Sequence, residues 1–192
     1  MGYCEMIFVV YMGGAAGDVV ASVIDHRNSK FNSLQRRMEM PLDRQRLKKP
    51  HTFESDAAKD EYVQQMSATY RSLPSHDIDY HVHNRHTTIG ITVQDTKIAN
   101  WAAKRFESVH RPQVWQQVCE ACGITNTRQY ADLMLHYSNM LEKQLSNTIK
   151  LERIVAGNLV EDLESVLGEK LDQKSVNVYR NWLDLVNGRF IV

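Results

Sequence analysis

The chain has 192 residues, with 23 basic and 23 acidic side chains and a formal net charge of zero. Hydrophobic residues make up 43% of it and charged residues 24%, which excludes a wholly disordered or collagen-like chain. Zero net charge disfavours a dedicated nucleic-acid binder, which usually carries a basic surplus. No apolar run approaches the ~20 residues of a membrane span, and the apolar stretch 1–12 is interrupted by Glu5. We therefore expect a cytoplasmic protein with a single domain over residues 1–192.

Hydrophobic periodicity predicts strands and helices in the first 110 residues, followed by helices almost throughout. The expected strands are 5–12, 78–83 and 88–93, the first being an apolar, β-branched run typical of a strand buried on both faces. The expected helices are 17–24, 56–73, 97–106, 112–122, 127–145, 159–167 and 175–186. This order predicts an α/β fold with a small, mostly parallel sheet of three to five strands in residues 1–110, on which a helical part, residues 111–192, packs.

A turn of small residues follows the first expected strand. It consists of Gly13, Gly14, Ala15, Ala16 and Gly17. Small side chains let backbone N–H groups approach an anion, and the N-terminus of the next helix adds a partial positive charge. A complete phosphate-binding motif would continue with Lys and Ser or Thr, whereas this turn is followed by Asp and Val. We predict that the turn binds a small anion, the alternative being a tight packing turn between strand and helix.

Three histidines lie within residues 81–86. His81 and His83, two apart on the expected second strand, project to the same face, so they suit a general base or a pair of zinc, nickel or copper ligands. Arg85 and His86 follow at the end of that strand, where open α/β sheets bind their ligands. We predict His83, or else His81, as the catalytic base and Arg85 as an anion contact, with no bound metal. The alternative is a polar edge strand with exposed histidines.

Residues 27–49 carry eight basic side chains against two acidic ones. This segment leaves room for a polyanionic ligand, including nucleic acid, despite the neutral sum of the chain. A solvated surface loop is the alternative interpretation.

Two of the three cysteines, Cys119 and Cys122, form a Cys-Glu-Ala-Cys motif. Such a pair can be a redox site or half of a zinc site. It lies at the end of an expected helix closed by Gly123, whereas a redox pair favours a helix N-terminus and structural zinc needs two more ligands. We therefore favour two small helix residues in a reducing compartment.

The order of the expected strands resembles the sulfotransferase branch of the P-loop fold. The first strand ends in a glycine-rich turn, the second ends in histidine, and the third leads into a charged helix. The chain is also similar to small P-loop-like proteins of phage genomes, and the resemblance covers residues 5–115. It implies that residues 13–17 bind the 5′-phosphate of a phosphoadenosine-type donor or another nucleotide, with His83 as the base of a sulfotransferase-like or nucleotide-kinase-like protein. The arginine and serine that bind the donor's 3′-phosphate in that family are replaced here by Gln94, Asp95 and Thr96.

Two other functions remain open from the sequence. One is a non-catalytic interaction protein, such as a phage factor that binds a host or virion protein. The other is a metal-dependent hydrolase that uses His81, His83 and His86.

Overall fold

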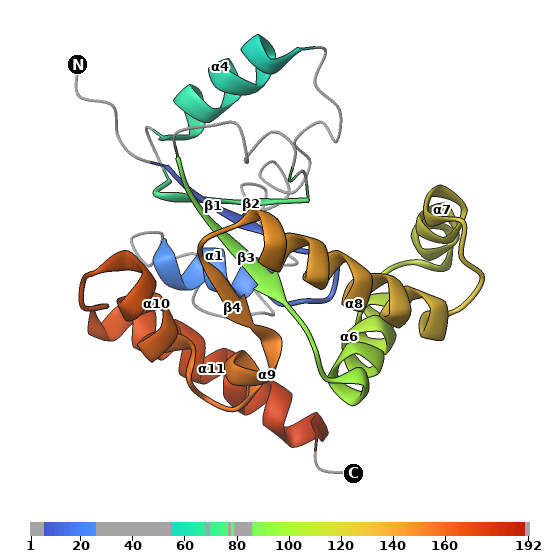
Figure 1. Ribbon diagram of the computed structural model, residues 1–192. Coiled ribbons are helices and arrows are strands. Elements are labelled where there is room, and N and C mark those ends of the chain that lie inside the picture. The colour runs from blue at the N-terminus through green and yellow to red at the C-terminus, as the bar shows by residue number, and fades with distance from the viewer. Residues whose placement is uncertain (1–5, 26–54, 68–69, 77, 79–85, 191–192) are drawn as a thin grey trace.

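The computed structural model describes residues 6–25, 55–67, 70–76, 78 and 86–190. They contain a four-stranded sheet in the order β2-β1-β3-β4, in which every neighbouring pair is parallel. The strands are β1 (Ile7–Val10), β2 (Ser72–Ser75), β3 (Thr87–Thr92) and β4 (Thr148–Lys150) (Figure 1). The predicted α/β class, with a small parallel sheet and a helical C-terminal region, is confirmed.

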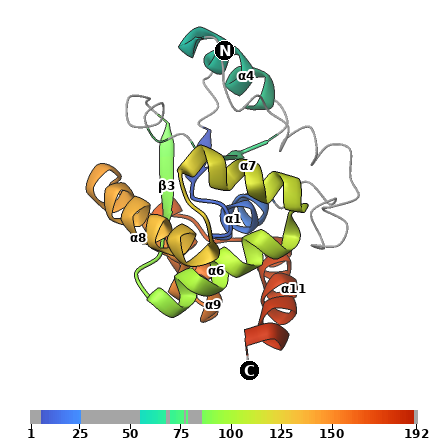
Figure 2. The same ribbon diagram turned by 90° about the vertical axis from the view of Figure 1, so that its right-hand side faces the viewer.

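Helices cover both faces of this sheet. The described helices are α1 (Gly17–Ile24), α4 (Asp56–Ser67), α6 (Thr96–Val109), α7 (Pro112–Cys122), α8 (Thr127–Gln144), α9 (Leu151–Val155), α10 (Leu159–Leu167) and α11 (Gln173–Phe190). Figure 2 shows α8 on one side of β3, and α1 with α11 on the other. Among the described helices, none has the length and apolar character that crossing a membrane requires.

The central strand β1 is buried on both faces. Val9 belongs to the main core cluster with α1, whereas Phe8 packs with Leu73 and with Val63 of α4. Val10 packs with Leu141 of α8. Because successive side chains of a strand point to opposite faces, a continuous apolar run is what a strand with helices on both sides requires. The prediction of a buried parallel strand here is confirmed.

The second strand lies earlier in the chain than predicted. Helix α4 ends at Ser67, and residues 72–75, expected to be the end of that helix and its stop, form β2 instead. Pro74 is tolerated because β2 is an edge strand, where a missing N–H donor need not break the ladder. Ile78, expected to begin a strand, is helical and buried, and residues 79–83 lie outside the described part.

A buried carboxylate joins α1 to the start of β2. The Asp25 Oδ1 atom accepts from the backbone N–H groups of Arg71, at 2.6 Å, and Ser72, at 3.1 Å. Its Oδ2 atom lies 2.9 Å from the Ser72 hydroxyl, which also lies 2.9 Å from the Ala21 carbonyl oxygen. These contacts stabilise β2 at a position where its own sequence has little strand propensity.

The helical C-terminal part differs from prediction at two places. It contributes β4, which pairs with β3 and so completes the sheet from beyond residue 110. On α11, the apolar pattern predicts that Trp182 and Leu185 face inward; Trp182 is buried, but Leu185 is 52% exposed and Val186 is buried in its place. The buried residues Val178, Trp182 and Val186 are spaced by four along one row of the helix, and Leu185 lies outside that row.

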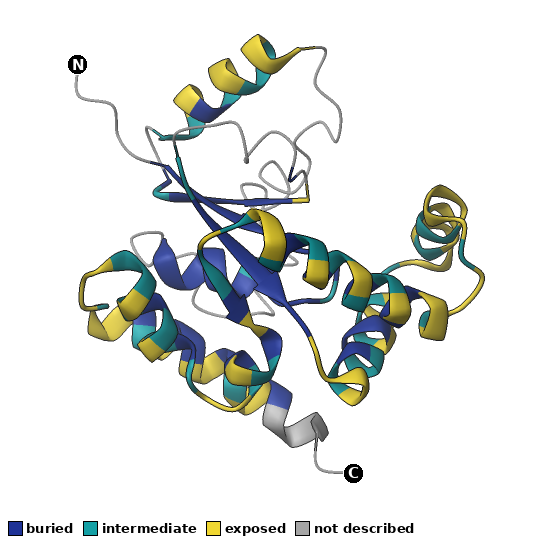
Figure 3. Ribbon diagram, viewed as in Figure 1, coloured by how far each residue is buried: buried dark blue, intermediate teal, exposed yellow. Residues whose placement is uncertain are grey.

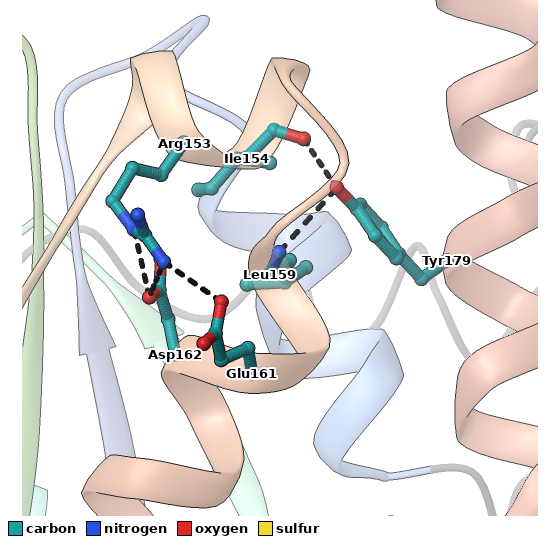
Figure 4. Close-up of polar contacts among 6 residues, drawn as sticks. All are labelled: Arg153, Ile154, Leu159, Glu161, Asp162 and Tyr179. Atoms are coloured by element: carbon teal, nitrogen blue, oxygen red, sulfur yellow. Dashed lines mark hydrogen bonds and ion pairs between the residues drawn. The ribbon is translucent and has the colours of Figure 1, made fainter.

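Helices α9, α10 and α11 are joined by polar contacts (Figure 4). The Tyr179 hydroxyl of α11 donates to the Ile154 carbonyl oxygen and accepts from the Leu159 N–H at 3.5 Å. At the surface, the Arg153 guanidinium pairs with Asp162 at 2.7 Å and with Glu161 at 3.2 Å. Burial is the main cause that raises the pKa of Tyr179, so its hydroxyl keeps its proton at neutral pH.

Candidate functional site

The strand order puts the topological switch point of the sheet at the end of β1. From β1 the chain passes to β2 on one side of β1, and β3 lies on the other side of β1 and leads on to β4. The connections that follow β1 and β3 therefore run toward opposite edges of the sheet. In open parallel sheets, such a switch point at the carboxyl ends of the strands is where ligands bind. The turn of residues 13–17 follows β1 at this edge and leads into α1.

The three glycines of this turn are required by close packing. A Cβ atom on Gly13 would lie 2.4 Å from the Phe106 ring, and one on Gly17 would lie 2.0 Å from the Tyr11 ring. Gly14 has a φ of +90°, and its Cβ atom would lie 2.5 Å from the carbonyl oxygen of Ala102. Glycine content alone is therefore explained by the fold, and evidence for a ligand has to come from other features of the turn.

Backbone donors provide such a feature. The Ala15 N–H donates to the Met12 carbonyl oxygen at 3.0 Å, and Ala16, in the left-handed region at φ 60°, caps α1 through its own carbonyl. Within the described part of the chain, four other N–H groups of the turn donate to no protein group; they belong to Gly13, Gly14, Ala16 and Gly17. Buried N–H groups normally find an acceptor, and donors grouped at a helix N-terminus favour an anion.

A histidine and two tyrosines lie beside the turn. His76, directly after β2, has its Nδ1 atom 2.6 Å from the Tyr11 carbonyl oxygen, and the two rings are 4.6 Å apart. The Tyr137 hydroxyl of α8 donates to the His76 carbonyl oxygen at 3.3 Å. The Tyr11 hydroxyl donates to Asp18 Oδ1 at 2.7 Å, so a strand end and the first turn of α1 share one polar cluster.

The connection after β3 is held by acidic side chains. Glu152 Oε1 accepts from the backbone N–H groups of Gln94 and Asp95, and the Gln94 amide donates to both Glu142 oxygens at 2.9 and 3.0 Å. Lys150 donates to the Gln94 side-chain oxygen at 2.7 Å. The Asp95 carboxylate caps α6 by accepting from the backbone N–H groups of Lys97 and Ile98. The loop that follows β3 is thus occupied by internal contacts of the protein.

Aromatic side chains from three helices pack next to Gly13. The Phe106 ring of α6 stacks on Tyr130 of α8 with centroids 5.2 Å apart and planes at 3°, and Trp115 of α7 meets both rings edge-on. The Tyr130 hydroxyl donates to the Gly13 carbonyl oxygen at 3.3 Å, and burial is the main cause that raises its pKa. The helical period of residues 127–145 predicts that Tyr130 is buried, but it carries no signal for the contact of this side chain with the turn.

The predicted histidine site is only partly described. His81, His83 and Arg85 lie outside the described residues, as does the basic segment 27–49. His86 was expected at the carboxyl end of a strand; it lies instead directly before β3, at the opposite edge from the turn, with its ring 5.3 Å from that of Phe8. The reason is that the second strand ends at Ser75, ahead of the histidine-rich segment.

The described residues hold no group of three or more His, Cys, Asp or Glu side chains able to bind a metal ion. No protein-family model, curated protein or solved structure matches the chain.

Proposed function

We propose that the chain binds a small phosphate-bearing molecule, such as a nucleotide or a phosphoadenosine-type donor, at residues 13–17, and transfers a group from it to an acceptor hydroxyl. The observation that carries the proposal is the set of N–H groups of Gly13, Gly14, Ala16 and Gly17 that lack a protein acceptor at the switch point of the sheet. A phosphate would satisfy these donors and would lie near the positive end of the α1 dipole.

His76 is the base in this proposal, in place of His83 or His81. A carbonyl oxygen can only accept, so the bond to Tyr11 assigns the proton of the neutral imidazole to Nδ1. The Nε2 atom then carries the lone pair and is the nitrogen able to take a proton from an acceptor hydroxyl. His76 lies at the surface, as a base that meets a second substrate requires.

Asp18 favours a ligand of low charge. Its carboxylate lies in the first turn of α1, at the position where phosphate-binding motifs carry a lysine, and it accepts from the Tyr11 hydroxyl. An added negative charge beside the turn repels a triphosphate more than a monophosphate. We therefore expect a nucleoside monophosphate or bisphosphate to bind more tightly than a triphosphate.

Isothermal titration with adenosine 3′,5′-bisphosphate, ATP and deoxynucleoside monophosphates tests the proposal. We expect the monophosphates or the bisphosphate to bind, and Asp18→Asn to tighten binding by roughly fivefold, because the amide still accepts from Tyr11 but carries no charge. Ser55→Asn, on the surface at the start of α4, is the matched control and should leave affinity unchanged. Absence of binding by all three ligands at millimolar concentration would contradict the proposal.

A further inference from the structure

We infer that Cys119 and Cys122 are a redox-active dithiol, which closes to a disulfide within the last turn of α7 when the protein meets a peroxide. This inference is independent of the proposed anion site, and it replaces the interpretation of the pair as two small helix residues. It rests on the placement of the two thiols, on their exposure and on the character of the helix that carries them.

The spacing of the two cysteines suits a disulfide. In an α-helix, Cα atoms three residues apart are about 5 Å from each other, within the roughly 4.4–6.8 Å that a disulfide spans. Both residues belong to the last turn of α7, with Cys122 as its final residue. Gly123 follows at φ 65° with no atom within 4 Å of the position a Cβ would take, so the chain after Cys122 has space for a small adjustment.

The surroundings of the pair make it accessible. Helix α7 has no buried residue, and Figure 3 shows it coloured as exposed and intermediate along its length. Cys122 is exposed and Cys119 is half-buried. Burial, followed by the neighbouring Cys122, Glu107 and Glu120, raises the pKa of Cys119. Because an oxidant reaches an exposed thiol more readily, the first reaction is assigned to Cys122 and the second to Cys119.

The chemistry is balanced with hydrogen peroxide as the oxidant. The Cys122 thiolate attacks one peroxide oxygen, the O–O bond breaks, and a sulfenic acid forms while hydroxide leaves and is protonated to water. The Cys119 thiolate then attacks the Cys122 sulfur, the S–O bond breaks, and a second water leaves after protonation. Two thiols are oxidised to one disulfide, and one peroxide is reduced to two waters.

The test uses the full chain with Cys4→Ser, so that only the pair in α7 can react. The protein is treated with hydrogen peroxide, then alkylated with N-ethylmaleimide under denaturing conditions and weighed intact. We expect two alkyl groups before oxidation, none after it, and two again after dithiothreitol. The same protein without peroxide, incubated for the same time, is the control.

Single variants separate the two roles. In the Cys4→Ser background, Cys119→Ser should leave a sulfenic acid on Cys122 that dimedone traps, whereas Cys122→Ser should react with peroxide at least about tenfold more slowly. Two alkyl groups retained after peroxide would overturn the inference. So would a disulfide-linked dimer as the main product, or oxidation to sulfinic acid without an intramolecular disulfide.

Discussion

The His76 imidazole donates through Nδ1 to the Tyr11 carbonyl oxygen over 2.6 Å. The two residues directly follow β2 and β1, so this bond joins the ends of neighbouring strands at the edge where the glycine-rich turn begins. It orients the ring and sets the tautomer with one contact. A side chain held in this way can act as a base without reorganising first.

Replacing His76 separates its two roles. His76→Asn keeps an N–H donor for Tyr11 but has no Nε2, so we expect group transfer to fall by about 10²–10⁴ while ligand affinity and thermal stability change little. The measurement is transfer from whichever donor binds in the titration, with affinity measured in parallel. If His76→Asn retained full transfer activity, the base would have to be another residue.

The close packing of the glycine-rich turn predicts that Gly14→Ala lowers the free energy of unfolding substantially. The residue has a positive φ, and its Cβ would meet the backbone oxygen of Ala102 at 2.5 Å, so we expect a loss of roughly 2–5 kcal/mol in the free energy of unfolding. Gly123→Ala is the matched control. It also has a positive φ but open space around it, so it should lose only about 1 kcal/mol. Urea denaturation gives both values, and equal losses would show that the contact with Ala102 contributes nothing.

Asp25 offers a pair of variants that differ in hydrogen bonding. Asp25→Ala leaves the N–H groups of Arg71 and Ser72 without their acceptor, and we expect a loss of about 2–4 kcal/mol in the free energy of unfolding. Asp25→Asn keeps that acceptor, and its amide can donate to the Ser72 hydroxyl while the hydroxyl donates to Ala21, so the loss should stay below about 1 kcal/mol. Chemical denaturation tests this, and an Asn variant as unstable as the Ala variant would contradict it.

Two buried tyrosines predict a loss of stability in alkali. Burial raises the pKa of Tyr130 and of Tyr179, whereas a tyrosine in the unfolded chain ionises near pH 10. Below about pH 10 both tyrosines are protonated in the folded and in the unfolded chain, and the stability that their raised pKa values contribute is fully present. Above it the unfolded state loses protons first, so the free energy of unfolding falls as pH rises toward the folded-state pKa values.

Urea titrations on either side of pH about 10 measure this fall. Tyr130→Phe should make the slope of stability against pH shallower, whatever its effect on stability at neutral pH through the lost bond to Gly13. Lys104→Gln, an exposed change on α6, serves as a control for general surface charge. An unchanged slope in Tyr130→Phe would show that this tyrosine does not titrate between the two states.

The local sequence pattern was enough to predict the helices and strands that bury a long apolar stripe or a continuous apolar run. The apolar run around Val9, the strand at 88–93 and the helices α7, α8, α10 and α11 lie within a few residues of their predicted bounds, whereas α9 was not predicted. Each of these segments contains enough apolar residues to show its own period. The short edge strands were missed because Ser-Leu-Pro-Ser and Thr-Ile-Lys show no such period; they are strands because β1 and β3 offer hydrogen bonds to them.

The amino-acid pattern was enough to predict the α/β class, the buried first strand and the glycine-rich turn at its end, since these depend on residues adjacent in the chain. The contact that brings His76 to that turn depends on the tertiary structure. Moving the second strand to Ser72–Ser75 places His76 beside Tyr11, 65 residues away, and places His86 at the far edge. Side-chain period is a local property of a segment, whereas the partner of a strand, and hence what its last residue contacts, is set by packing between distant parts of the chain.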